Sequence, residues 1–441
     1  MQPGQPFAIS AAVSWPDRQF FHAGCRADVM KLLVEQDCPQ CGAPVELTEA
    51  DYVLCCESCG IRSMVQSNSL PRYVLPVSRE VSSTGLLLAP YVRFKGTIYL
   101  VTESGIDHRV IDTTQVASSA QGLPASLGVR PQAMRLQRIN PASENLFLSQ
   151  TLKAGAILEK AASVGNLVPQ VGQQFFHRAY IGEHLSYIYL PLVIKNSGLY
   201  DGVTEEKLCD LADFISGDLS SRRYDDGWKV RFVATLCPQC GAGLEGSGDC
   251  QVMLCPNCHS AWGLSTKELI RLDWQMQVGD SATKLFLPFW KISTHIPALN
   301  IYSFADFVER SNQPFLPRAQ WRGKVMSVWV PAFRLRPKVF LQVGRQVTIN
   351  QWRCRPVAAK LQPNFFPATL PFSEARQAVK LMLAAAAASP KRIFPMLPYT
   401  RLTEMTIQLI YLPFTELGCD WTQPHTGVAI GKNILKYSRT L

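Results

Sequence analysis

Eight of the fourteen cysteines fall into four Cys-x-x-Cys pairs, and this spacing restricts the possible folds more than any other feature of the chain. In each of two sets, fourteen residues separate the two pairs. Two cysteines with two residues between them lie on one tight turn, so both thiolates can reach one ion at about 2.3 Å, and two facing turns complete a tetrahedron. The sequence therefore predicts two four-cysteine metal sites, formed by Cys38, Cys41, Cys56 and Cys59 and by Cys237, Cys240, Cys255 and Cys258.

Cys55 is a second possible ligand in the first set because it directly precedes Cys56. When the second set is superimposed on the first, Cys56 aligns with Cys255 and Cys55 aligns with Leu254, a position expected in a strand. We therefore expect Cys56 to bind the metal and Cys55 to be a buried structural residue. The same structural role is expected of the cysteines outside the two sets, Cys25, Cys209, Cys250, Cys354 and Cys419. His259 directly follows a ligand, but it is expected to be a bystander because four cysteines are already available.

Zinc is the metal that a closed tetrahedron of thiolates favours, because Zn²⁺ needs no open position and does no redox work. Iron is the alternative, since rubredoxin-type sites use the same facing turns. The aromatic residues that usually follow the first pair in those sites are missing, because residues 43–45 read Ala-Pro-Val and residues 242–244 read Ala-Gly-Leu. The sequence therefore favours two structural Zn²⁺ ions over iron.

The order of several short motifs predicts that the chain is an internal repeat. Pro90 and Pro288 follow the two cysteine sets at similar distances, and Tyr189-Leu-Pro matches Tyr411-Leu-Pro. Pro131 also aligns with Pro331. The Ser-Glu pair at 143 aligns with the pair at 373, and each of these pairs precedes an expected helix. On that alignment the second half carries about thirty extra residues, approximately 336–371.

Strands and helices both follow from these patterns. Proline at the start of β-branched and aromatic runs indicates strands at 93–101, 186–194 and 325–335, and alanine-rich and leucine-rich stretches indicate helices at 146–164 and 374–388. The expected fold class is α+β, with each half made of a four-cysteine module and a β-rich mixed domain with one or two helices. The expected boundaries are 25–65, 66–200, an acidic helical linker at 201–226, 227–265, and 266–441 with the insertion at 336–371.

The net charge of +10 is concentrated in the last third of the chain. Residues 301–441 contain 19 basic and 6 acidic side chains, whereas no lysine or arginine lies between Lys31 and Arg62 or between Arg231 and Lys267. The cysteine modules therefore have no cations of their own for phosphate contacts. The basic segment predicts either a surface for an anionic partner or an ordinary solvated face of strands, and its candidate residues are Arg334, Arg336, Lys338, Arg345, Arg353, Arg355 and Lys360.

No catalytic motif is present in the sequence. The segment from Gly427 to Asn433 has too few residues between its glycines and lacks the Ser or Thr of a phosphate-binding loop. The adjacent Glu183 and His184 are expected to be a buried structural pair. No signal peptide and no run of about 18 apolar residues is seen, so we expect a soluble cytoplasmic protein without a small-molecule substrate.

The paired cysteines and the repeated Leu-Pro-Phe and Tyr-Leu-Pro motifs resemble a poorly characterised bacterial type of protein that joins transcription-factor-type or rubredoxin-like zinc ribbons to β-rich domains. The resemblance is specific at the eight cysteines, and it implies that they hold zinc and that the role is not catalytic. The expected function is a scaffold or adaptor that assembles other proteins in a complex, including at an anionic membrane surface. The alternatives are a nucleic-acid-associated factor that uses the basic segment and an iron-containing electron carrier.

Overall fold

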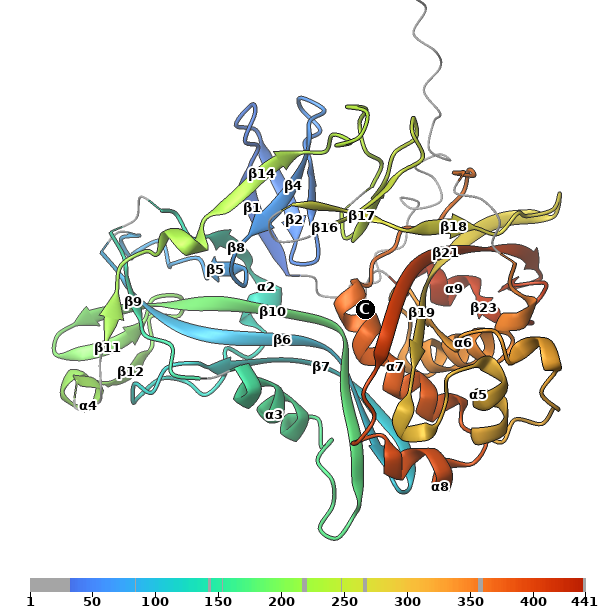
Figure 1. Ribbon diagram of the computed structural model, residues 1–441. Helices are drawn as coiled ribbons and strands as arrows, with labels where there is room; N and C mark the ends of the chain where they lie inside the picture. The colour runs from blue at the N-terminus through green and yellow to red at the C-terminus, as the bar shows by residue number, and fades with distance from the viewer. Residues whose placement is uncertain are drawn as a thin grey trace, which may run out of the picture.

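A computed structural model describes residues 32–83, 85–141, 144–152, 154–215, 220–246, 248–264, 268–355 and 360–438. The fold is mixed and rich in strands, as the sequence indicates. Figure 1 shows two lobes, one from each half of the chain, with the cysteine-containing hairpins lying above both. Cys25 and Ser143 lie outside the described residues, so their expected roles stay predictions.

The first half is built mainly from one eleven-stranded sheet. Its two longest strands pair in antiparallel fashion in the middle of the lobe, and the shorter strands extend the sheet on either side. The elements are β1 (Leu33–Asp37), β2 (Pro44–Thr48), β3 (Val53–Cys55), β4 (Arg62–Ser67), β5 (Arg72–Val74), β6 (Leu87–Thr102), β7 (Gly105–Val116), α2 (Arg130–Ala133), β8 (Arg135–Arg138), β9 (Leu146–Leu148), α3 (Ala154–Val164), β10 (Phe175–Lys195), β11 (Gly198–Asp201), β12 (Lys207–Asp210), α4 (Leu211–Ile215), β13 (Ser221–Arg222) and η1 (Asp226–Trp228).

The second half has a six-stranded sheet and most of the helices described. Its elements are β14 (Val230–Ala234), β15 (Val252–Leu254), β16 (Ala261–Leu264), β17 (Leu269–Leu272), β18 (Trp274–Met276), β19 (Thr283–His295), η2 (Pro297–Leu299), α5 (Phe304–Arg310), η3 (Ala319–Trp321), β20 (Ser327–Pro331), α6 (Pro337–Ile349), η4 (Gln351–Arg353), α7 (Phe372–Ala386), α8 (Pro390–Ile393), η5 (Phe394–Met396), β21 (Thr403–Leu417), β22 (Asp420–Thr422), β23 (Ala429–Gly431) and α9 (Lys432–Lys436).

The central strand pairs of the two lobes have the same register. Tyr189 in β10 lies opposite Pro90 in β6, and Tyr411 in β21 lies opposite Pro288 in β19. Each tyrosine carbonyl accepts a backbone hydrogen bond from the short strand region beside it, from Leu75 at 3.1 Å in the first lobe and from Gln277 at 2.9 Å in the second. Pro90 and Pro288 therefore occupy equivalent positions, and so do Tyr189 and Tyr411, as the sequence predicts.

The alignment of Pro131 with Pro331 is wrong. Pro331 ends strand β20, whereas Pro131 lies in helix α2. The equivalent positions are instead Ala117 and Ala332. Their amides donate to the carbonyls of Pro90 and Pro288, at 2.9 and 3.0 Å, and their carbonyls both accept at 2.8 Å from the amides of Thr151 and Thr369. The stretch from Ala117 to Thr151 is nearly as long as that from Ala332 to Thr369, so this register leaves no thirty-residue insertion.

The basic segment is helical where strands were expected. Residues 337–349 form α6, which begins with a proline at its first turn, a position where the missing N–H is not needed. Phe340, Val343, Gly344 and Val347 follow helical spacing and are buried. The alternation of basic and apolar residues around 334–338 suggested a strand, but the apolar spacing further along the segment determines the structure.

Two expected helices are shorter than the sequence suggested. Leu146–Leu148 forms strand β9 between β6 and β13, so the helix expected at 146–164 is limited to α3. The acidic linker contains the last residue of β11, strands β12 and β13 and the five-residue helix α4. The apolar residues there, including Leu208 and Leu211, pack against the core of the first lobe. Tertiary pairing therefore overrides the helical spacing at both places. By contrast, α7 begins and ends within about two residues of the expected helix at 374–388.

The two lobes share one hydrophobic core. Tyr99, Val101, Phe176 and Ile181 come from the ends of β6 and β10, yet they belong to the same buried cluster as the helices and sheet of the second lobe. The Tyr99 hydroxyl donates to the carbonyl of Pro337 at 3.3 Å. Because apolar burial is the main favourable term in folding, this shared core fixes the lobes to each other.

No helix in the described part of the chain is long and apolar enough to cross a membrane.

Candidate metal centres

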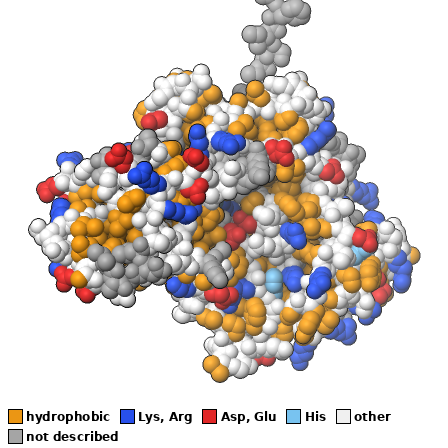
Figure 2. Space-filling view, turned by 60° about the vertical axis from the view of Figure 1, so that its left-hand side comes forward, with side chains coloured by type: hydrophobic (Ala, Val, Ile, Leu, Met, Phe, Trp, Pro, Cys, Tyr) orange, Lys and Arg blue, Asp and Glu red, His pale blue; other side chains and the backbone are white. Residues whose placement is uncertain are grey.

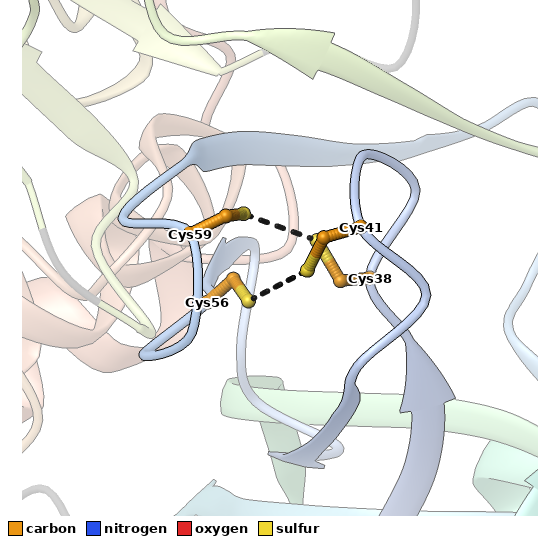
Figure 3. A group of neighbouring side chains, drawn as sticks. All are labelled: Cys38, Cys41, Cys56 and Cys59. Carbon is orange, nitrogen blue, oxygen red and sulfur yellow. Dashed lines mark hydrogen bonds between the residues drawn. The ribbon is translucent and has the colours of Figure 1, made fainter.

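The predicted cysteines converge in two groups of four. Within each group the sulfur atoms all lie within 4.8 Å of one another. In the first group, Cys38 and Cys59 are 3.7 Å apart and Cys41 and Cys56 are also 3.7 Å apart, with the four sulfurs pointing toward a common centre (Figure 3). In the second group the closest pairs are Cys237 with Cys258 at 3.6 Å and Cys240 with Cys255 at 3.5 Å.

These separations fit a tetrahedral metal ion. Four thiolates at about 2.3 Å from a central zinc ion are spaced about 3.8 Å from each other. The donor set consists of sulfur alone, which suits Zn²⁺ and also fits a single iron ion. Two metal ions can therefore be held by these eight cysteines, and four protein ligands leave no open position for a substrate.

Each pair of cysteines is shaped by the same backbone turn. The amide of the first cysteine donates to the carbonyl five residues later, and its carbonyl accepts from the amide four residues later, with all eight distances between 2.7 and 3.0 Å. The residue after the second cysteine has a positive φ of 72°, 73° and 74° at Gly42, Gly60 and Gly241. His259 takes the fourth such position at φ 55°, where a side chain is unfavourable. His259 is therefore part of a turn and lies outside the four-sulfur group.

The cysteines within each group differ in pKa. A backbone hydrogen bond from Cys59 is the main cause that lowers the pKa of Cys56 to about 6. Burial raises the pKa of Cys237, but hydrogen bonds from Ser260 and the neighbouring backbone outweigh it and lower this pKa to about 6. In the same groups two thiols have a raised pKa. A backbone hydrogen bond from Ala43 lowers the pKa of Cys41, but the neighbouring cysteines outweigh it and raise this pKa to about 12, and burial is the main cause that raises the pKa of Cys255 to about 12. Since only deprotonated cysteine binds metal, these thiols must lose their protons when an ion enters.

The second centre has a hydroxyl group that the first lacks. Ser260 Oγ lies 3.0 Å from Cys258 Sγ and 3.4 Å from Cys237 Sγ, and it accepts a hydrogen bond from Trp262 Nε1 at 2.7 Å. Because the indole supplies a donor to the oxygen, the hydroxyl proton is free to point toward sulfur. The corresponding residue of the first centre is Ile61, which accepts through its backbone carbonyl only.

The other cysteines that the structure describes lie outside both four-sulfur groups, as expected, but Cys419 is exposed and not buried. Cys56 belongs to the first four-sulfur group and Cys55 does not. Cys55 is exposed, however, because it ends strand β3 on the solvent side, so its expected burial is wrong. Cys250 is fully buried beside the second centre without joining its sulfur group.

The two centres are joined into one block. Strand β14, which leads into the second centre, pairs with β4 of the first in the register Phe232 to Val65. The amides of Tyr52 and Val53 both donate to the carbonyl of Gly248, at 2.8 and 3.0 Å. In the second centre the third strand of the sheet is β17, which follows β15 and β16 in the chain. In the first centre the third strand beside β3 and β4 is β14, which comes from the other half of the chain.

Of the seven basic residues predicted to bind an anionic partner, Arg334 is buried and the other six are exposed. Arg334 is 7% exposed, and its guanidinium contacts His184 between the lobes. Lys338 and Arg345 are exposed on α6, seven positions apart, and Arg336 precedes its first turn. Arg353 lies 4.6 Å above the ring of Trp352 and donates to the carbonyl of His425 at 3.2 Å. Arg355 and Lys360 are exposed.

Sequence reasoning missed a polar cluster between the lobes. His184 from β10 contacts Arg334, and the amide of Gly182 donates to the carboxyl of Glu374 in α7. The expected pairing of Glu183 with His184 is thus replaced by contacts across the lobes. Burial raises the pKa of Glu374 to about 8 and, together with Arg334, holds the pKa of His184 well below its usual value. The sequence carries no local signal for contacts between residues this far apart.

Comparison with known proteins gives no relative to guide the assignment, since no protein-family model, curated protein or solved structure matches the chain.

Proposed function

We propose that this protein is a non-catalytic scaffold or adaptor, stabilised by two zinc ions, that holds other proteins in a complex. The observation that carries the proposal is the pair of closed four-sulfur sites joined by β14 into one block. A site with four protein ligands stabilises a fold and leaves no coordination position for chemistry. The matched registers of the two lobes further support an internal duplication, in which each half supplies one zinc ribbon and one β-rich domain.

Exposed apolar side chains beside the ribbons support a protein partner. Val233 in β14, Leu236 before the second set and Ile270 in β17 are 39%, 55% and 51% exposed. Other exposed apolar side chains are spread over the rest of the chain, and these three give the ribbon block apolar groups that a protein partner could cover. Figure 2 shows acidic and basic side chains interspersed with apolar ones over the face in view, as is usual for a protein surface.

The test combines metal analysis with isolation of the native complex. We expect about two zinc ions per chain and a colourless protein, since a ferric tetrathiolate site would be red. The full-length chain should migrate in a complex larger than itself in cell extract, and Leu236→Ser with Ile270→Ser should release it without loss of zinc. Migration of the wild-type chain as a free monomer in fresh extract contradicts the scaffold role.

Binding of nucleic acid through the basic segment is the second candidate. Lys338 and Arg345 share the exposed face of α6, and Arg318 and Arg353 both stack on Trp352, at 4.7 and 4.6 Å. Phosphate contacts make affinity fall steeply with salt. Salt-dependent retention on RNA or DNA that is lost on reversing the charges of Arg345, Arg353 and Arg355 supports this candidate, and unchanged retention rejects it.

A further inference from the structure

A groove of about 650 Å³ lies where the two lobes meet, away from both metal centres. It is formed by the start of β10 in the first lobe and by α7 and residues 400–405 in the second. Pockets of about 300–1,000 Å³ are typical of sites for small ligands. Its polar lining is basic and contains no carboxylate among the described residues, with His177, Arg178, Ser373, Arg376, Lys380 and Arg401 as the main groups.

The positive charges of this groove are not neutralised by the protein. In the part of the chain that the structure describes, Arg376, Lys380 and Arg401 form no ion pair within 4 Å. Arg178 differs, because its guanidinium pairs with Glu159 at 2.8 Å. Lys380 donates to the carbonyl of Leu397 at 2.9 Å, and burial lowers its pKa. Arg376 and Arg401 are exposed and Lys380 is half-buried, so the three cations create a positive field that attracts an anion to the groove.

The N-terminus of a long helix opens on the same groove. Phe372 and Ser373 are the first two residues of the fifteen-residue helix α7, and both line the groove. The N-cap residue is Pro371, and no described side chain caps this end. Glu374, the one acid in the first turn, is directed to the amide of Gly182 and is absent from the lining. Free amides and the helix dipole at such an end favour an anion.

His177 provides a further polar atom without a partner, Nε2, on a ring that also hydrogen-bonds the backbone of Gln377. Its Nε2 atom is buried and forms no hydrogen bond with any described residue. Burial and the nearby Lys380 lower its pKa to about 4, so the imidazole is neutral near pH 7 and Nε2 can donate or accept. A ligand oxygen in the groove offers the partner that this atom lacks.

We propose that this groove binds a phosphate-bearing ligand, held by Arg376, Lys380 and Arg401 together with the first turn of α7. A phosphate group matches this site better than a single carboxylate, because it carries nearly two negative charges and can accept from several donors at once. The same chemistry can come from a soluble phosphorylated molecule or from a phospholipid headgroup. The site is independent of the scaffold role, and its failure would leave that role untouched.

The test measures binding of pyrophosphate to the full-length, zinc-loaded chain by calorimetry at low salt. We expect one site per chain. The double variant Arg376→Gln with Arg401→Gln should weaken binding about tenfold or more, because each substitution removes a hydrogen bond to a charged group. Arg79→Gln with Arg109→Gln is the matched control, since both residues are exposed outside the groove and the net charge falls equally. The control should change the affinity by less than about twofold, since distant exposed charges are screened.

Vesicle sedimentation separates the two sources of phosphate. Phosphatidylcholine vesicles that contain phosphatidylinositol phosphate should bind the wild-type chain, and not the groove variant, if the ligand is a lipid headgroup. Pyrophosphate binding without vesicle binding assigns the site to a soluble ligand. Absence of pyrophosphate binding, or an equal loss in the control, overturns the proposal. Zinc content and thermal unfolding verify that each variant is folded.

Discussion

At the scale of single residues, the two metal centres differ by one hydroxyl group. Ser260 contacts two of the four sulfurs in the second centre, whereas Ile61 stands in its place in the first. We expect Ser260→Ala to weaken metal binding at the second centre roughly 10-fold to 100-fold, which is the usual effect of removing a partner of the ligands. The substitution also leaves Trp262 Nε1 without its acceptor. Metal release to a chelator, followed in time, measures the effect.

Ser58→Ala is the control for this substitution. Ser58 lies between Cys56 and Cys59 of the first centre, and it is exposed. The same chemical change there should leave the rates of metal release from both centres nearly unchanged. If Ser260→Ala releases the metal of the second centre as slowly as the wild type does, the hydroxyl does not support the site.

Residue spacing was sufficient to find the metal ligands but not the environment of other side chains. Cys-x-x-Cys pairs encode a local turn, so all eight ligands could be read directly from the sequence. Arg334 was expected on a surface because its neighbours are basic, yet it is buried against His184 from the other lobe. The contact partner of a charged residue depends on tertiary packing, which the local pattern does not encode.

At the scale of elements, strand β14 couples the first metal centre to the second half. Phe232 in this strand is half-buried and packs on the apolar cluster that contains Cys38 and Cys56. We expect Phe232→Ala to cost about 1–3 kcal/mol of unfolding free energy, since part of a phenyl ring leaves a packed site. It should also accelerate metal loss from the first centre, although Phe232 is not a ligand. Chemical unfolding and chelator competition measure these two effects.

Val233→Ala provides the comparison within the same strand. Val233 is 39% exposed and its side chain lies on the opposite face. Its truncation should change stability by less than about 0.5 kcal/mol. Phe232→Ala acts on the first centre and Ser260→Ala on the second. The two variants should therefore accelerate metal release from different centres. Faster metal release from the same centre in both variants would contradict this assignment.

Sequence motifs predicted the strands at the repeat's prolines and tyrosines but misplaced the elements between them. Pro90 and Pro288 were matched correctly, although both lie inside β6 and β19 and not at the strand starts that the proline rule suggests. Pro131 and Pro331 share a motif but not a structural role, because one lies in a helix and the other in a strand. The helical spacing from Phe340 to Val347 was the signal that could have identified α6.

At the scale of the whole molecule, the lobes are joined both by a shared apolar core and by buried polar contacts. Glu374 is the acidic member of these contacts, and it is 4% exposed. Burial is the main cause that raises its pKa from 4.5 to about 8, and the nearby Arg334 only partly opposes this. The folded protein therefore binds this proton more tightly than the unfolded chain. The resulting stability is complete below about pH 4.5 and is lost as the pH rises to about 8.

Replacing Glu374 with glutamine tests whether the junction of the lobes limits stability at alkaline pH. Glutamine retains an acceptor for the amide of Gly182 and cannot ionise. The unfolding free energy of Glu374→Gln relative to the wild type should rise between pH 5 and pH 8, by up to about 1.4 kcal/mol per pH unit. His184 is present in both proteins, so its titration cancels in the difference to a first approximation. Glu80→Gln, at an exposed position, should give a difference that does not vary with pH. A constant difference for Glu374→Gln as well would mean that Glu374 is ionised within the folded protein throughout this range, and that the lobes accommodate a buried charge.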